Sequence, residues 1–307
     1  MRRALIAVLI LLVGIVAFDV LLPHQAVELG LGIERARSGL HEERATLDRF
    51  DIAYLDGGQG QPLLLIHGFG ADKDNFTRVA RHLTPKYRVI IPDLPGYGDS
   101  SKLEDAGYTI ADQVEYLRQF VKQLNLGKVH LGGNSMGGYI ASAWAAKYPD
   151  EVESLWLLAP AATRVAIGTS ELAAIYKETG RNPLLARTAD EHAFVRGFVM
   201  SRPPLMPYSF KKVLGERAAA NFPLHEKIFK SLVGGPALEE WHRSPILTPA
   251  LIVWGRKDRA LHPDGATATA ALMPRAKVIL MEGIGHLPMI EDVAGSARDY
   301  LAFRDSL

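Results

Sequence analysis

The sequence predicts an α/β fold with an open, mostly parallel central sheet that is covered by helices on both faces. From Arg44 onward, short apolar segments of strand length alternate with helical segments, which is the pattern of successive β-α units. Some of these segments are continuously apolar, as Pro62–Ile66 is, and strands buried on both faces have this character. The third observation is Gly133-Asn134-Ser135-Met136-Gly137, a Gly-x-Ser-x-Gly sequence between one such strand and a helix.

Length, composition and charge exclude several classes of protein. The 307 residues are 48% hydrophobic, enough for a sizeable core. The 35 lysines and arginines nearly balance the 34 aspartates and glutamates, so the chain has no strong overall field for nucleic acid. It has no cysteine, which removes disulfides and thiolate metal sites.

Residues 1–22 are predicted to form a transmembrane signal anchor. Arg2 and Arg3 precede an uncharged run from Ala4 to Phe18, and a helix from Ala4 to Leu22 would rise about 28 Å, close to the thickness of a bilayer core. A cleaved signal peptide is the alternative, but cuts after Ala17 or Ala26 would place Ile15 or His24 where a small residue is needed. The arginines favour a cytoplasmic N-terminus. We therefore expect a single-pass protein of the cytoplasmic membrane, with the large C-terminal part on the periplasmic side.

Within the anchor and the segment after it, three smaller features matter. Asp19 is expected near the far membrane interface, where a carboxylate is tolerated. Pro23 predicts a break or kink, and residues 23–43 are predicted to be a juxtamembrane helix or linker, helical from about Gln25 to Glu43. Ala26 and Gly30 are four residues apart, so a homodimer through the N-terminal helices remains open.

The α/β core is predicted from residues 44–161 and 244–307. Asp56–Gly60 is expected to be a turn of the hairpin type after the first strand, and Thr109 is expected to cap a long helix that ends near Asn125. Other helices are expected at Arg78–Leu83, at Tyr139–Lys147 and after each of the last two strands. The predicted strands are Phe50–Leu55, Pro62–Ile66, Tyr87–Pro92, Lys128–Leu131, Val152–Ala159, Ala250–Trp254 and Lys277–Met281.

The β-α alternation stops between Ala162 and Arg243. This segment is rich in helix formers, is interrupted by prolines, and holds more apolar side chains than a solvated face needs. We interpret residues 162–243 as a helical lid over an apolar pocket, with an ordinary run of surface helices as the alternative.

Ser135 is the predicted nucleophile. A serine hydroxyl needs a base to take its proton, and the base needs a carboxylate to orient it. Asp258 follows one predicted strand and His286 follows the last one, so both are expected with Ser135 at the carboxyl edge of the sheet. Asp258 could instead be a turn residue with Asp264 as the acid, and His286 could be an ordinary loop histidine.

An oxyanion hole needs two backbone N–H groups directed at the developing negative charge. The expected donors are Met136, directly after the serine, and Phe69, in the loop after the Pro62–Ile66 strand. His67 could be read as a second base, but a histidine that pins this loop through hydrogen bonds is the preferred interpretation.

With these motifs together, the chain from about residue 45 resembles the α/β-hydrolase superfamily. The residues that carry the resemblance are His67–Gly70, Asp93–Ser100, Gly133–Gly138, Trp254–Asp258 and Gly285-His286. Within the superfamily the chain is similar to membrane-anchored bacterial lipases and phospholipases A and to anchored monoacylglycerol lipases. The resemblance implies an α/β-hydrolase fold, a serine acyl-enzyme, no cofactor and no metal, with Ser135 as nucleophile, His286 as base and acid, and Asp258 as the orienting carboxylate.

The sequence thus predicts a membrane-tethered serine hydrolase that releases fatty acids from lipids, with phospholipase A or lysophospholipase activity first and acylglycerol lipase activity next. Relatives with an aspartate nucleophile are disfavoured because residue 135 is serine. A non-lipid esterase, a carbon–carbon bond hydrolase, an acyltransferase and a non-catalytic lipid-binding protein of this fold remain alternatives.

Overall fold

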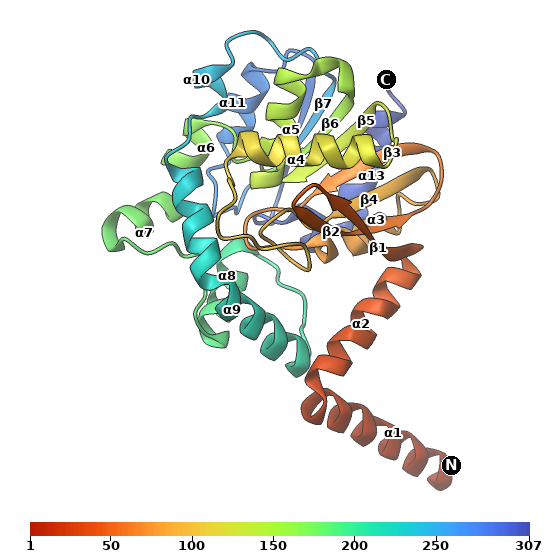
Figure 1. The fold of residues 1–307 in the computed structure, drawn as a ribbon. Helices are drawn as coiled ribbons and strands as arrows, with labels where there is room; N and C mark the ends of the chain where they lie inside the picture. Colours follow the sequence, from red (N-terminus) through yellow and green to blue (C-terminus); the bar gives the residue numbers. More distant parts are fainter.

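One eight-stranded sheet organises the computed structural model, which describes residues 1–307. The strand order is β1-β2-β4-β3-β5-β6-β7-β8. β2 pairs antiparallel with β1 and with β4, and all later neighbours are parallel (Figure 1), which confirms the predicted mostly parallel sheet. The strands are β1 (Leu40–Leu47), β2 (Phe50–Gly57), β3 (Gln61–Ile66), β4 (Tyr87–Pro92), β5 (Val129–Asn134), β6 (Val152–Leu158), β7 (Ala250–Gly255) and β8 (Ala276–Met281).

Helices cover both faces of this sheet, and each face has its own apolar core. The larger core includes Phe120 and Trp144, from the layer of α4, α5 and α11. The smaller core includes Val79 and Tyr300, from the layer of α3 and α13, and there Tyr300 stacks on Trp156 with ring centroids 4.6 Å apart. These helices are α3 (Thr77–Ala80, after the 3-10 turn η1, Lys73–Phe76), α4 (Ile110–Gln123), α5 (Met136–Lys147, before the 3-10 turn η2, Pro149–Glu151), α11 (Gly265–Ala271), α12 (Pro288–Glu291) and α13 (Val293–Arg304).

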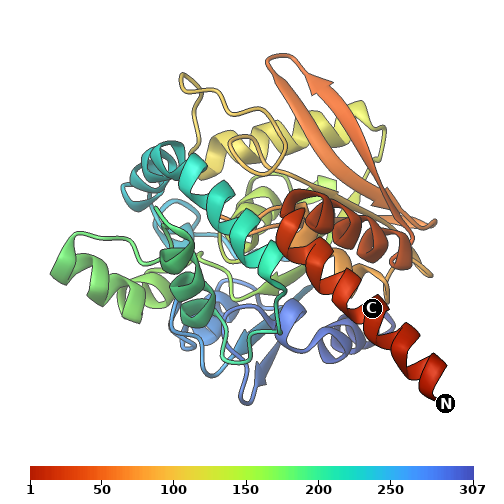
Figure 2. The ribbon, with the colours of Figure 1, turned by 90° about the horizontal axis from the view of Figure 1, so that it is seen from below.

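The N-terminal segment forms two helices, α1 (Arg2–Leu21) and α2 (Pro23–Arg37), which meet at Leu22 as the predicted break before Pro23 implies. α1 has no buried residue and is the one helix long and apolar enough to cross a membrane. It projects away from the body of the protein (Figures 1 and 2).

The structure corrects the extent of the second helix. The prediction ran to Glu43, but α2 ends at Arg37, and Leu40–Leu47 is a strand. Gly39 has φ of +65°, a left-handed conformation that ends the helix at low steric cost. The charged residues at the start of β1 favoured the prediction of a continuing amphipathic helix. Its pairing with β2, which buries Leu40, Ala45 and Leu47, makes it a strand.

The hairpin-type turn predicted at Asp56–Gly60 is also wrong. β2 turns back on β1 through Asp48 and Arg49 and does not pair with β3, because β4 lies between them. Gly58 instead allows the chain after β2 to pass close to the backbone at Tyr87. It has φ of +76°, and a Cβ there would lie 2.2 Å from the carbonyl oxygen of Tyr87.

Five helices are inserted between β6 and β7, and we call them the inserted helices. They pack near the ends of the sheet and reach the N-terminal segment, since α2 packs against α9 (Figure 2). A Cβ on Gly30 of α2 would lie 2.9 Å from the ring of Phe210 of α9. The inserted helices are α6 (Arg164–Gly168), α7 (Glu171–Thr179), α8 (Ala189–Val199), α9 (Tyr208–Val233) and α10 (Leu238–Trp241).

Candidate active site

Ser135 lies on a sharp turn between β5 and α5. Its backbone has φ of +54° and ψ of −116°, a strained conformation for a residue other than glycine. Two glycines make the turn possible. A Cβ on Gly133 would lie 2.3 Å from the carbonyl oxygen of Gly137, and one on Gly137 would lie 2.1 Å from that of Ile66. The turn therefore presents a partly exposed serine at the N-terminus of a helix.

His286 and Asp258 form a hydrogen-bonded pair beside this turn. His286 Nδ1 lies 2.7 Å from Asp258 Oδ2, and the side chain of Asp258 is fully buried. Its carboxylate also accepts hydrogen bonds from the backbone N–H groups of Ala260 (2.9 Å) and Leu261 (3.0 Å) and from Trp254 Nε1 (3.0 Å). These donors fix the carboxylate and offset the cost of burying its charge.

Asp264, the alternative acid, lies elsewhere. Its side chain is 78% exposed and its nearest histidine is His262, with Asp264 Oδ2 3.6 Å from His262 Nδ1. The structure therefore places Asp258, and not Asp264, against His286.

Ser135 and His286 line one pocket together with Phe69, although no direct hydrogen bond joins the two side chains. Such bonds are often long in the free state of an enzyme and tighten when substrate binds. The pocket has a volume of about 220 Å³, and we call it the Leu214 pocket after a residue of α9 in its wall.

A second apolar pocket of about 200 Å³ also reaches Ser135. We call it the Leu232 pocket. Phe69 and Leu184 line both pockets, so the serine lies where two apolar spaces meet under the inserted helices. The other apolar residues that line the Leu232 pocket include Ile110, Ile167, Leu172, Leu232, Val233 and Leu261.

The two predicted oxyanion donors flank the serine. Phe69 follows Gly68, on which a Cβ would lie 3.3 Å from Ser135 Cβ, and Phe69 N donates no hydrogen bond within the protein. Met136 is the first residue of α5, where helical N–H groups lack an intrahelical partner. Both N–H groups are available beside the serine.

His67 is fully buried and links two loops. Its Nδ1 lies 2.8 Å from the carbonyl oxygen of Gly68, and its Nε2 accepts a hydrogen bond from Leu94 N at 3.0 Å. Burial lowers the pKa of His67, so the ring is neutral. It does not line either pocket with Ser135, and the structure supports the interpretation of a loop-pinning histidine.

Two positioning side chains were missed from the sequence. Asn134, directly before the serine, donates from Nδ2 to the carbonyl oxygens of Leu158 (3.0 Å) and His286 (3.1 Å). It therefore ties the serine turn to the histidine loop. The position of Asn134 inside the Gly-x-Ser-x-Gly sequence could have indicated a role at the site. Its partner could not be predicted, because His286 is 152 residues away in the chain.

Glu291 is the second. Its carboxylate accepts hydrogen bonds from Gly285 N (3.0 Å) and Leu287 N (3.3 Å), on either side of His286. It also accepts from Ser201 N and Arg202 N, each at 2.8 Å, just after α8. One carboxylate thus holds the histidine loop and the inserted helices together, and no sequence pattern signalled it.

Comparison with known proteins identifies the family. Residues 61–293 match the family described as alpha/beta hydrolase fold. The chain belongs to this family. It is 41% identical to Lipase 3 of Moraxella sp. (strain TA144) over 89% of this chain and 88% of that protein. It is 28% identical to monoacylglycerol lipase ABHD6 of Homo sapiens over 80% of this chain and 76% of that protein.

A solved structure agrees with this assignment. The chain superimposes on a membrane phospholipase A, a bacterial virulence factor, with a TM-score of 0.90 and 38% identity, over 100% of this chain and 99% of that one. This α/β hydrolase is accordingly a serine hydrolase of carboxylic esters, and the resemblance predicted from the motifs is confirmed. It contains no cluster of three or more metal-ligating side chains of the His, Cys, Asp or Glu type.

Proposed function

We propose that this hydrolase releases fatty acids from membrane lipids through a Ser135–His286–Asp258 triad while tethered to the bilayer by α1. The observation that carries the proposal is the meeting of two apolar pockets at Ser135, beside the His286–Asp258 pair. Apolar pockets suit acyl chains, and the lipases and phospholipase A among the relatives support lipid esters as substrates.

In the proposed mechanism, His286 Nε2 takes the proton of Ser135 as the serine oxygen attacks the ester carbonyl carbon. Asp258 holds the other ring nitrogen and stabilises the imidazolium that forms. The N–H groups of Phe69 and Met136 stabilise the oxyanion. His286 then protonates the departing alcohol. In the second half of the reaction, His286 takes a proton from a water molecule that attacks the acyl-enzyme, and it returns this proton to the Ser135 oxygen as the fatty acid leaves.

The inserted helices suit the role of a lid, and we propose this role for residues 162–243. Met206 and Leu214 line the Leu214 pocket, and Leu172 and Leu232 line the Leu232 pocket. These side chains shield an acyl chain from water, which a set of ordinary surface helices would not do.

We propose that α1 is an uncleaved, single-pass anchor of the cytoplasmic membrane with the catalytic part on the periplasmic side. Its 20 residues have no buried side chain, and Arg2 and Arg3 favour a cytoplasmic N-terminus. A homodimer through these helices would have to use surfaces other than Gly30, because Gly30 faces Phe210 of the same chain.

Glycerophospholipids are the proposed first substrates, with phospholipase A or lysophospholipase activity, and acylglycerols come next. Wild type and Ser135→Ala would be incubated with extracted membrane lipids, and the consumed species identified by mass spectrometry. We expect lipid loss and free fatty acid only with wild type, and equal circular dichroism spectra. Fatty acid release by Ser135→Ala at the wild-type rate would exclude this mechanism.

The tether has its own test. Membrane fractions should retain the full chain with Met1 intact and release a chain that lacks residues 1–16. This truncation keeps Asp19, which contacts α9. A soluble wild type with a processed N-terminus would contradict the anchor. Labelling with a fluorophosphonate would distinguish the enzyme from a non-catalytic lipid binder.

A further inference from the structure

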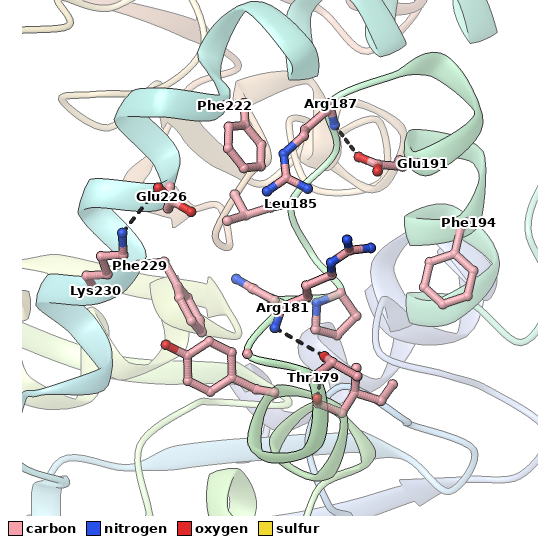
Figure 3. A pocket seen from close by; sticks show the side chains of 15 residues that line it. Thr179, Arg181, Leu185, Arg187, Glu191, Phe194, Phe222, Glu226, Phe229 and Lys230 are labelled. Atoms are coloured by element: carbon pink, nitrogen blue, oxygen red, sulfur yellow. Dashed lines mark hydrogen bonds and ion pairs between the residues drawn. The ribbon is translucent and has the colours of Figure 1, made fainter.

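A separate cleft lies within the inserted helices, outside the Leu214 and Leu232 pockets (Figure 3). Its volume is about 290 Å³, and charged and polar side chains make up more of its lining than in the other two pockets, so it suits a headgroup better than an acyl chain. Ser135 and His286 do not line it. Its walls come from α7, α8, α9 and the loop from Gly180 to Arg187.

Two arginines in this cleft have no carboxylate partner. Arg181 and Arg187 extend into the cleft in Figure 3, and neither forms an ion pair within 4.0 Å. The guanidinium of Arg187 lies over the ring of Phe222, 4.3 Å from its centroid, which fixes its orientation. Two like charges in one small cleft repel each other, and an anion between them would remove this repulsion.

The carboxylates of the cleft already have partners. Glu226 accepts from Lys230 Nζ at 3.2 Å, and Glu191 accepts from the backbone N–H of Arg187 at 2.5 Å. Both carboxylates and Lys230 appear in Figure 3 on the same cleft. They reduce the positive potential, so a singly charged anion suits the cleft better than a doubly charged one.

A buried donor in the wall also lacks a partner. Asn182 is buried, with only 8% of its surface exposed. Its Oδ1 accepts a hydrogen bond from Leu184 N at 2.9 Å, and its Nδ2 has no hydrogen-bond partner. An unpaired buried N–H group destabilises a protein unless an acceptor reaches it. The wall of the cleft thus holds a buried polar side chain with one unpaired donor, next to Arg181.

The cleft adjoins the site of ester hydrolysis. Leu185 lines both the cleft and the Leu214 pocket, and Phe229 lines both the cleft and the Leu232 pocket. The cationic cleft therefore borders both of the spaces that reach Ser135.

We propose that this cleft binds the phosphodiester of a phospholipid headgroup through Arg181 and Arg187, and so favours phospholipids over uncharged acylglycerols at Ser135. The inference rests on the proposed lipid hydrolase function. A guanidinium donates two parallel hydrogen bonds to phosphate oxygens, and a phosphodiester carries the single negative charge that the cleft favours.

The test compares two double variants of the full-length protein with equal loss of charge. One is Arg181→Gln/Arg187→Gln. The matched control is Lys177→Gln/Lys211→Gln, which changes exposed lysines of α7 and α9 that neither line the cleft nor form ion pairs. Each is assayed in the same detergent micelles with a phosphatidylethanolamine and with a monoacylglycerol of the same acyl chain.

For the arginine variant we expect the ratio of kcat/KM for phospholipid to that for monoacylglycerol to fall about tenfold, through KM, because charge-assisted hydrogen bonds are lost. The lysine control should keep the wild-type ratio. An unchanged ratio in the arginine variant, or an equal loss on both substrates, would overturn the proposal.

A binding measurement separates this proposal from the proposed function. Ser135→Ala, with and without the two arginine substitutions, is titrated calorimetrically with glycerophosphoethanolamine and with inorganic phosphate. We expect glycerophosphoethanolamine to bind only where both arginines are present. No binding, or stronger binding of inorganic phosphate, would overturn the headgroup assignment even if the enzyme is an active lipase. A wild type that hydrolyses neither lipid would instead refute the proposed function, and the titration would still test the cleft.

Discussion

The carboxylate of Asp19 in α1 accepts a hydrogen bond from the backbone N–H of Tyr208, the first residue of α9, at 3.1 Å. It also accepts from Ser209 N at 3.4 Å and from the Ser209 hydroxyl. An anion at a helix N-terminus is favourable because the first N–H groups lack partners and the helix dipole is positive there. The apolar N-terminal helix is thus joined to the helix that lines the Leu214 pocket.

Replacing this carboxylate should loosen the start of α9. We expect Asp19→Ala to destabilise the chain by about 1 kcal/mol, the usual value of an N-terminal cap, and to speed hydrogen exchange in residues 208–214. The measurement is hydrogen–deuterium exchange in detergent. The control is Glu28→Gln, which removes an exposed and unpaired charge from α2. Equal exchange in the two variants would contradict the capping role.

Substitutions of Asp258 and Asp264 should have very different effects on kcat. Asp258→Asn removes the carboxylate that orients His286, and kcat should fall by roughly four orders of magnitude, as in serine-triad enzymes generally. Asp264→Asn changes an exposed residue 3.6 Å from His262 and should leave kcat within about twofold. Ester hydrolysis by the two purified variants decides between the acids. A larger loss with Asp264→Asn would show that the assignment is wrong.

Glu291 is expected to position His286. Glu291→Gln keeps the size of the side chain, but its amide N–H₂ would face backbone donors such as Gly285 N and Ser201 N. We expect kcat to fall by about ten- to a hundredfold with little change in KM, because a small displacement of a catalytic group slows the reaction strongly. Glu282→Gln, which affects an exposed partner of Arg256, is the control. Equal effects of the two substitutions would argue against the positioning role.

The buried Lys73–Asp93 pair should contribute strongly to stability. Lys73 Nζ lies 2.9 Å from Asp93 Oδ2 and 2.5 Å from Asp99 Oδ2, and both Lys73 and Asp93 are almost wholly buried. Lys73→Met would leave the Asp93 charge without its partner, so we expect a loss of about 3–5 kcal/mol in the free energy of unfolding. Lys86→Met breaks an exposed pair with Asp305 and should cost less than about 1 kcal/mol. Denaturant unfolding measures both, and similar losses would refute the difference.

His225 should make stability depend on pH. Burial lowers the pKa of His225 to about 4, below the value of about 6.5 expected in the unfolded chain. As the pH falls below 6.5, the unfolded chain binds a proton that the folded protein does not, so stability falls until the pH reaches about 4. His225→Gln should therefore reduce the slope of unfolding free energy against pH by roughly 1.4 kcal/mol per pH unit between pH 6 and 5. The exposed His82→Gln is the control, and an unchanged slope in His225→Gln would contradict this account.

Much of the fold was predictable because the parallel strands are buried on both faces. Such strands are continuous apolar runs, and β4 was predicted at its observed bounds, Tyr87–Pro92. The predicted cap at Thr109 is present, since its side chain accepts from Asp112 N. β1 was missed because an edge strand carries charged residues on its open side, and five of its eight residues are exposed.

The candidate catalytic residues were predictable from the sequence, but the side chains that position them were not. Local sequence places Ser135 on a strand-to-helix turn, and the short segments around Asp258 and His286 place them after strands. The side chains that hold them, Asn134 and Glu291, act on partners far away in the chain or on backbone N–H groups. Every residue except proline has a backbone N–H group, so the residue type does not show which N–H donates to a given carboxylate. No sequence pattern could therefore reveal these contacts.

The sequence by itself therefore determined the α/β-hydrolase family, the three candidate catalytic residues and the apolar N-terminal helix. Only the tertiary structure decided that Asp258 rather than Asp264 contacts His286, that Asp19 meets the start of α9, and that Arg181 and Arg187 share a cleft without a carboxylate partner. The physical reason is the range of the forces. Turn geometry and apolar patterning act within a few residues of the chain. Pairing of buried charges and packing of helices depend on which distant segments the fold brings within a few ångströms.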